Sequence, residues 1–159
     1  MYRTSNPLSE TSRATIAREL NACLVDGLDL KSQIKVAHWN VKGPHFAALH
    51  PLFEGFATAL DGFTDTIAER AVALGALAVG TAKQVAKTSR IPEYPASTTA
   101  GLEHVALLAD RFEVFLESLR AAREAGEAQG DTDTVDLLTG MITEFEKNGW
   151  FLRASLEGI

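Results

Sequence analysis

The residues best suited to metal chemistry in this chain of 159 residues lie between positions 38 and 69. They are three histidines and three acids: His38, His45, His50, Glu54, Asp65 and Glu69. Imidazole nitrogen and carboxylate oxygen together are typical ligands of first-row transition metals. A chain reversal at Gly43-Pro44 would leave His38 and His50 equally far from the turn, so antiparallel helices would place their imidazoles side by side.

The spacing of these residues forms two pairs on one helix. His50 and Glu54 are four residues apart, and so are Asp65 and Glu69, which puts each pair on a single helix face. His50 and Asp65, however, are separated by a rise of about 22 Å along a straight helix. One metal ion cannot therefore be held by both pairs of the same chain.

A second copy of the chain removes this difficulty. A twofold axis crossing the helix between Ala59 and Leu60 would set Glu54 opposite the partner's Asp65, and His50 opposite the partner's Glu69. Such a contact necessarily makes two identical sites. Each site would combine residues of one subunit with acids of the other, a mixed set suited to iron. From one subunit come His38, His50 and Glu54, and from the other Asp65 and Glu69.

The elements that must position these residues are helices. Apolar residues recur at three-to-four spacing in four stretches, at about 16–41, 47–77, 99–127 and 132–156. Residues 81–99 carry Pro92 and Pro95 without a sustained period, which predicts a long crossover with room for a short helix. We therefore expect an all-α fold: a short tail over residues 1–10, then one four-helix bundle over 11–159. Its long crossover joins the second and third helices.

Composition narrows the function classes. The 15 basic and 21 acidic residues give a net charge of −6, and no basic cluster is present, which disfavours nucleic acid and anionic membranes as partners. The single Cys23 excludes a disulfide framework and fits a reducing compartment as a buried, inert thiol. No apolar run has the length of a membrane span. We therefore expect a cytoplasmic location, with association with the nucleoid left open.

Three segments carry a family resemblance. Residues 35–43 (KVAHWNVKG), Leu49-His50 and residues 65–70 (DTIAER) resemble the signature of the Dps mini-ferritins, and the likeness extends to residues 93–95 and 150–152. The resemblance implies a ferritin-like bundle assembled into a hollow shell of twelve subunits. It also implies ferroxidase sites at the subunit dyads, which take ferrous iron and hydrogen peroxide or dioxygen. Iron would be stored as ferric mineral, which protects against oxidative stress.

By the same resemblance, two further residues accompany the site. Trp39 would lie beside the iron and supply an electron, or alternatively pack as a large aromatic at the dimer contact; the two roles are compatible. Lys35 would contact a carboxylate of the site. The chain departs from the family pattern at Glu54, where Asp is usual, and at Pro51, where many relatives carry an acid thought to seed mineral.

A second acidic group opens the last predicted helix. Asp131, Asp133 and Asp136 resemble residues that line the family's threefold iron pore, and Asp136 is the strongest pore candidate because it lies one turn inside the helix. The alternative is plain helix capping, since acids favour helix N-termini. His45 and His104 match no ligand position, and we treat both as ordinary polar groups.

Three other functions remain as alternatives. A DNA-compacting protein with secondary iron binding is disfavoured by the acidic charge and by an N-terminal segment in which Arg3 is the one basic residue before Ser9. A classical ferritin or rubrerythrin is disfavoured because the sequence contains no Glu-x-x-His motif. A structural bundle without metal would make the alignment of histidines and acids a coincidence.

Overall fold

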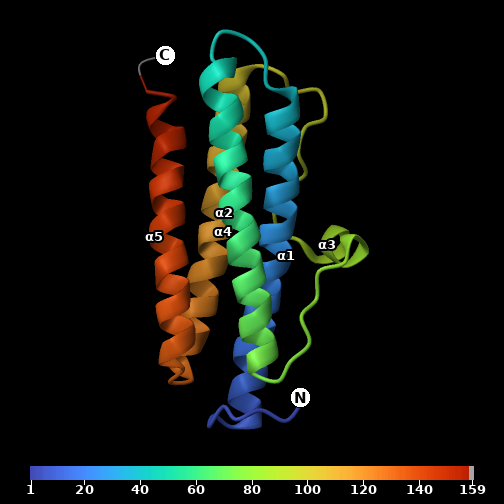
Figure 1. The fold of residues 1–159 in the computed structure, drawn as a ribbon, viewed down its shortest axis with the longest axis vertical. Coiled ribbons are helices and arrows are strands. Elements are labelled where there is room, and N and C mark those ends of the chain that lie inside the picture. The colour runs from blue at the N-terminus through green and yellow to red at the C-terminus, as the bar shows by residue number, and fades with distance from the viewer. Residues whose placement is uncertain (158–159) are drawn as a thin grey trace.

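A computed structural model describes residues 1–157, which form four long helices and one short helix. These are α1 (Glu10–Asn40), α2 (Phe46–Ala73), α3 (Ala82–Thr88), α4 (Gly101–Ala128) and α5 (Thr132–Ala154). The long helices pack as a bundle, and the crossover carrying α3 returns along the outside from the end of α2 to the start of α4 (Figure 1). The predicted four-helix bundle with a long crossover is confirmed, and the short helix within it is present. Within residues 1–157 no helix has the length and apolarity needed to cross a bilayer.

The second helix is shorter than the sequence predicts. The apolar pattern extends to Leu77, but α2 ends at Ala73. Gly75 adopts a φ of 90°, a conformation that favours glycine, and the amide of Ala76 donates to the carbonyl of Ala71. These two features close the helix, and Leu77, which the apolar pattern had included, is 66% exposed beyond its end.

The first residues are attached to the bundle. The amide of Tyr2 donates to the Gly75 carbonyl at 2.6 Å, and Thr4 Oγ1 donates to the Ala73 carbonyl at 2.7 Å. Arg13, from the first turn of α1, donates to the Leu74 carbonyl between them. The carbonyls at the end of α2, which have no partner inside the helix, are thereby satisfied. The segment predicted as a tail thus fixes the end of α2.

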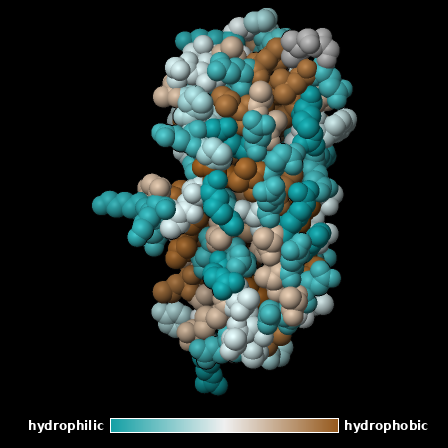
Figure 2. Space-filling view, turned by 180° about the vertical axis from the view of Figure 1, so that it is seen from behind, coloured by the Kyte–Doolittle hydropathy of each residue, from teal (hydrophilic) through white to brown (hydrophobic). Residues whose placement is uncertain are grey.

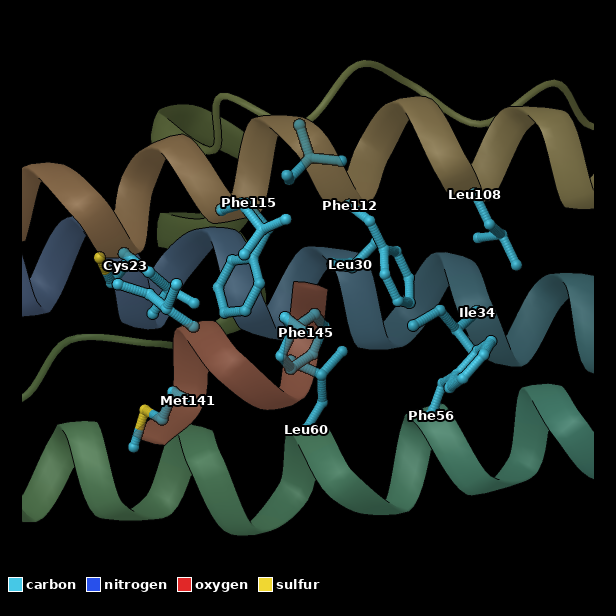
Figure 3. Packing of buried hydrophobic residues seen from close by; sticks show 14 of the residues in the cluster. Cys23, Leu30, Ile34, Phe56, Leu60, Leu108, Phe112, Phe115, Met141 and Phe145 are labelled. Atoms are coloured by element: carbon cyan, nitrogen blue, oxygen red, sulfur yellow. The ribbon is translucent and has the colours of Figure 1, made fainter. Parts of the chain in front are cut away.

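Aromatic residues from three helices meet in the middle of the core. Phe145 of α5 lies 4.9 Å from Phe115 and 5.2 Å from Phe112, both of α4, and 5.7 Å from Phe63 of α2, measured between ring centroids. Figure 3 shows Phe145 between the side chains of α4 and Leu60 of α2. Outside this core, the surface seen from behind is mixed, with hydrophobic side chains exposed in scattered places (Figure 2). The core therefore fixes α2 against α4 and α5, and so holds the helix that carries most of the candidate ligands.

A buried carboxylate attaches the crossover to the bundle. Asp26 of α1 is fully buried and accepts hydrogen bonds at 2.9 Å from both the amide and Nε of Arg90, and another from the hydroxyl of Ser118. Cys23, one turn earlier, is also buried, and burial raises the pKa of its thiol to about 12, so the expected inert thiol is confirmed. These contacts hold the crossover against α1 and α4.

The Asp26→Asn substitution is expected to lower stability by about 2 kcal/mol, because it removes the charge of a fully buried carboxylate that accepts hydrogen bonds from Arg90 and Ser118. The measurement is denaturant unfolding followed by circular dichroism at one fixed protein concentration, since assembly also contributes to stability. Glu144→Gln, which alters an exposed pair with Lys147, is the matched control and should cost no more than about 0.5 kcal/mol. Equal losses in the two variants would contradict this role for Asp26.

Candidate metal centre

The two candidate histidines lie on either side of the turn between α1 and α2. His38 belongs to the last turn of α1 and His50 to the second turn of α2, and Gly43 makes the reversal with a φ of 97°. Their imidazole rings stack with centroids 3.7 Å apart and planes inclined by 24°. The predicted side-by-side placement of the two rings is confirmed.

The imidazole of each histidine lies within hydrogen-bond distance of the backbone carbonyl of the other. Nδ1 of His38 lies 2.8 Å from the carbonyl oxygen of His50, and Nδ1 of His50 lies 2.9 Å from the carbonyl oxygen of His38. A carbonyl oxygen only accepts hydrogen bonds, so Nδ1 must carry the proton in both rings. When neutral, each imidazole then has its lone pair on Nε2. This is the tautomer of a histidine that binds metal through Nε2 while its other nitrogen donates to a carbonyl.

A carboxylate lies beside the pair. Oε2 of Glu54 is 3.4 Å from Nε2 of His38, and the ammonium of Lys35 also contacts this oxygen. The hydrogen bond from Lys35 holds the pKa of Glu54 below its ordinary value, and the nearby histidines act in the same direction. Glu54 is therefore ionised at any pH at which an imidazole can bind metal. The predicted contact between Lys35 and a site carboxylate is present.

The other two acids lie apart from this group. Asp65 and Glu69 are exposed on the outer face of α2, and the rise from His50 to Asp65 is about 22 Å. Within residues 1–157, the chain brings no three side chains of the His, Cys, Asp or Glu types to a single point suited to metal. One chain thus stacks His38 on His50 with Glu54 beside His38, without converging the three on one point, and leaves Asp65 and Glu69 facing outward.

The face of α2 that carries these acids is open to a neighbour. A side chain added at Gly55 or Gly62 would meet nothing within 4 Å. Thr58, between them in sequence, is exposed as well. Small residues along one exposed helix face allow a second helix to approach closely, as a contact across the proposed axis requires.

Two neighbours of the histidines are also exposed. Trp39 has 67% of its surface accessible, and its ring centroid lies 5.8 Å from Nζ of Lys35. Pro51 lies inside α2 with its ring at the surface, so the residue after His50 offers neither an amide proton nor an acid. Near the end of α1, Trp39 and Lys35 thus lie side by side.

The acids at the start of α5 have different surroundings. Asp131 is buried and caps α5 by accepting from the Thr134 amide, while Arg70 of α2 donates to it at 2.6 Å. Burial raises the pKa of Asp131, but hydrogen bonds from Thr134 and Arg70 outweigh this and leave it below its ordinary value. Capping is thus the observed role of Asp131. Asp133 and Asp136 are exposed, and Asp136 lines a pocket of about 440 Å³ together with Glu127.

The sequence did not reveal the surroundings of three other residues. Arg70 follows Glu69 directly, and no spacing in the sequence indicated its ion pair with Asp131, 61 residues away. His104 is fully buried, with Nδ1 2.6 Å from the hydroxyl of Tyr94, and burial lowers its pKa. His45 is exposed at the start of α2 and caps nothing with its side chain.

Comparison with known proteins identifies the family of this chain. The family described as Ferritin-like domain matches residues 17–159. A DNA protection during starvation protein of Agrobacterium fabrum (strain C58 / ATCC 33970) is 35% identical over 98% of this chain and 96% of its own length. A DNA protection during starvation protein 2 of Bacillus anthracis is 38% identical over 86% of this chain and 93% of its own.

Solved structures that superpose on this chain are also Dps proteins. Mycobacterium smegmatis Dps in its tetragonal form superposes with a TM-score of 0.93 at 30% identity, covering 99% of this chain and 95% of that one. A Dps protein of Vibrio cholerae O1, described as a member of a broad superfamily of ferritin-like diiron-carboxylate proteins, has a TM-score of 0.91 at 29% identity, with 99% of both chains covered. The chain belongs to the ferritin-like family and, within it, to the Dps proteins.

Lys35→Gln is expected to tighten ferrous iron binding about fivefold near neutral pH, because it removes a positive charge beside Glu54 worth about 1 kcal/mol in a solvated setting. Loss of Lys35 also raises the pKa of Glu54, so the gain should shrink as the pH falls through that raised value. Anaerobic titration at several pH values measures both effects. Lys31→Gln, which removes a similar contact to Asp61, is the control. The same change in both variants would contradict the role of Lys35.

Proposed function

We propose that the protein is a ferroxidase that oxidises ferrous iron at two sites shared across the dyad of a homodimer. The ferric product would be stored as mineral inside a shell of twelve such subunits. The observation that carries this proposal is the pair of mutually fixed imidazoles, His38 and His50. Both keep Nε2 free for metal, and ionised Glu54 lies beside them.

The shared site supplies what ferrous iron needs. Imidazole nitrogens suit the ferrous ion, and carboxylates stabilise the ferric product, which carries one more positive charge. His38, His50 and Glu54 would bind from one subunit, and the partner's Asp65 and the partner's Glu69 would complete the set. Two ferrous ions give one electron each, and one hydrogen peroxide takes up both electrons with two protons and becomes two molecules of water. Peroxide is thereby removed without forming hydroxyl radical.

The role of the protein in the cell follows from this chemistry. Removal of ferrous iron and peroxide together would protect against oxidative stress, which agrees with the protective function named in its relatives. We infer that protection proceeds through iron chemistry more than through direct DNA contact. The net charge of −6 opposes phosphate, and residues 2 and 4 at the start of the chain are bonded to the end of α2. A cytoplasmic location fits the free thiol of Cys23.

A shared site predicts that two inactive variants can restore each other. Variant one carries His38→Ala and His50→Ala, and variant two carries Asp65→Ala and Glu69→Ala, so each homodimer loses both sites. A mixed dimer keeps one intact site, because variant one still offers both acids and variant two offers both histidines and Glu54. Ferrous oxidation should recover to about half of wild type if every dimer is mixed, and to about a quarter if subunits pair at random.

Mixed assemblies are verified by mass spectrometry before activity is measured. The control mixes variant one with a form of itself that carries a different affinity tag, which should restore nothing. Verified mixed dimers without recovery would mean that the ligands belong to one chain.

Asp136 is expected to contribute to iron uptake through a threefold opening, which the starts of three α5 helices would form in the proposed shell. It is exposed and lines a pocket with Glu127, whereas the carboxylate of Asp131 is already paired with Arg70. Asp136→Asn should slow mineral formation while leaving tight binding at the dyad sites unchanged. Asp133→Asn, an exposed acid of the same helix start outside this pocket, is the matched control. Equal uptake rates in Asp136→Asn and wild type would leave Asp136 without this role.

A further inference from the structure

Phe46 is a large apolar residue that lies outside the core. It is the first residue of α2, and 46% of its surface is exposed. Its ring centroid lies 5.0 Å from that of the His50 imidazole, with the two planes inclined by 33°. Phe46 and His50 are four residues apart, which places them on one face of the helix in consecutive turns. The side chain of Phe46 thus packs against a candidate ligand.

The His50 imidazole is held from three directions. His38 stacks on one of its faces, with ring centroids 3.7 Å apart, and the carbonyl of His38 accepts from its Nδ1 at 2.9 Å. Because that face is filled by His38, Phe46 contacts the ring from another side. None of these three contacts uses the lone pair of Nε2. The contacts therefore fix the ring without occupying the nitrogen that is expected to bind metal.

The start of α2 needs such support because its backbone is weakly closed. His45, at the N-cap, makes no side-chain hydrogen bond to the helix. Pro51 has no amide proton, so the carbonyl of Ala47 receives no helical hydrogen bond from it. His50 lies between these positions, and long side chains on a helix lean toward the preceding turn. That turn begins with Phe46, so the imidazole of His50 leans onto its ring.

A ligand that is already ordered binds metal more tightly than a mobile one. Each side chain that must be immobilised on binding costs free energy, and a side chain fixed beforehand avoids that cost. Contacts between aromatic rings contribute about as much free energy as the ordering of one side chain requires. The contact with Phe46 is therefore sufficient to keep His50 ordered before metal is bound.

We propose that Phe46 is a positioning residue of the metal centre, which holds the imidazole of His50 in the orientation that presents Nε2 to iron. The inference rests on the proposed function for the role of His50 as a ligand. It adds a residue that acts on iron through that ligand without touching the metal. Phe46 contributes to the affinity for ferrous iron and not to the oxidation step, in which its ring takes no part.

The test compares Phe46→Ala with Phe46→Tyr, which keeps an aromatic ring at this exposed position. Anaerobic titration of the full-length protein should show that Phe46→Ala binds ferrous iron about fivefold more weakly, the factor expected when one further side chain must be ordered. Oxidation at saturating iron should stay near wild type, since only binding is lost. Phe46→Tyr should restore the affinity. Phe151→Ala removes an exposed phenylalanine whose ring lies against Trp150, and should change neither quantity.

Crystal structures of the metal-free variants show the imidazole directly. In Phe46→Ala the ring of His50 should be disordered or turned away from the His38 carbonyl. In Phe46→Tyr and Phe151→Ala it should keep its stacked position. An ordered and unchanged His50 ring in Phe46→Ala would overturn the proposal.

A double-mutant cycle separates this role from a contact between subunits, which an exposed phenylalanine can also make. Sedimentation establishes the assembly state of every variant at the concentration of the titration. In the His50→Ala background, Phe46→Ala should weaken the remaining iron binding no further, because the ligand on which it acts is gone. A loss in that background as large as in the wild-type background would mean that Phe46 acts through assembly, and the proposal would be wrong.

Failure of the proposed function gives a different result. If His50→Ala binds ferrous iron as tightly as wild type, His50 is not a ligand, and the proposed site fails together with this inference. If His50→Ala weakens binding but Phe46→Ala does not, the ligand set stands and the positioning role is wrong.

Discussion

The rigidity of α2 is the constraint on which the rest of the structure depends. An α-helix rises by a fixed amount per residue, so His50 and Asp65 stay about 22 Å apart however the side chains turn. The chain therefore presents two halves of a ligand set at separate places on one rigid element. Under the proposed function, symmetry brings the halves together, and one self-complementary contact yields two sites at once. Oxidation of iron then requires assembly.

The turn between α1 and α2 positions the two histidines of the ligand set. The last carbonyls of a helix have no partner within it, and the carbonyl of His38 is one of these. His50 donates to it, and His38 donates in return to the carbonyl of His50. One pair of contacts thus closes the helix end, fixes the angle between α1 and α2, and selects the tautomer of both rings. Loss of either imidazole would therefore disturb the other as well as remove a ligand.

The sequence was sufficient for the parts of the site that depend on spacing. Helical periodicity located the four long helices, and equal distances from Gly43-Pro44 predicted the stacking of His38 on His50. It was insufficient where the outcome depends on backbone direction or on distant partners. The end of α2 was misplaced because the apolar run continues past Gly75, whose φ of 90° is a property of the folded backbone. The pairing of Arg70 with Asp131 joins residues far apart in sequence, and no local pattern encodes it.

The surroundings of Lys35 differ between the single subunit and the proposed dimer. In a single subunit it neutralises Glu54 and lowers the pKa of that carboxylate. In the proposed dimer each site gains two more acids, so three carboxylates would face one lysine and two imidazoles. Repulsion among these acids opposes assembly in the absence of metal, and a bound cation relieves it. In such a dimer, iron binding and subunit association would favour each other, and linkage would make the effect reciprocal.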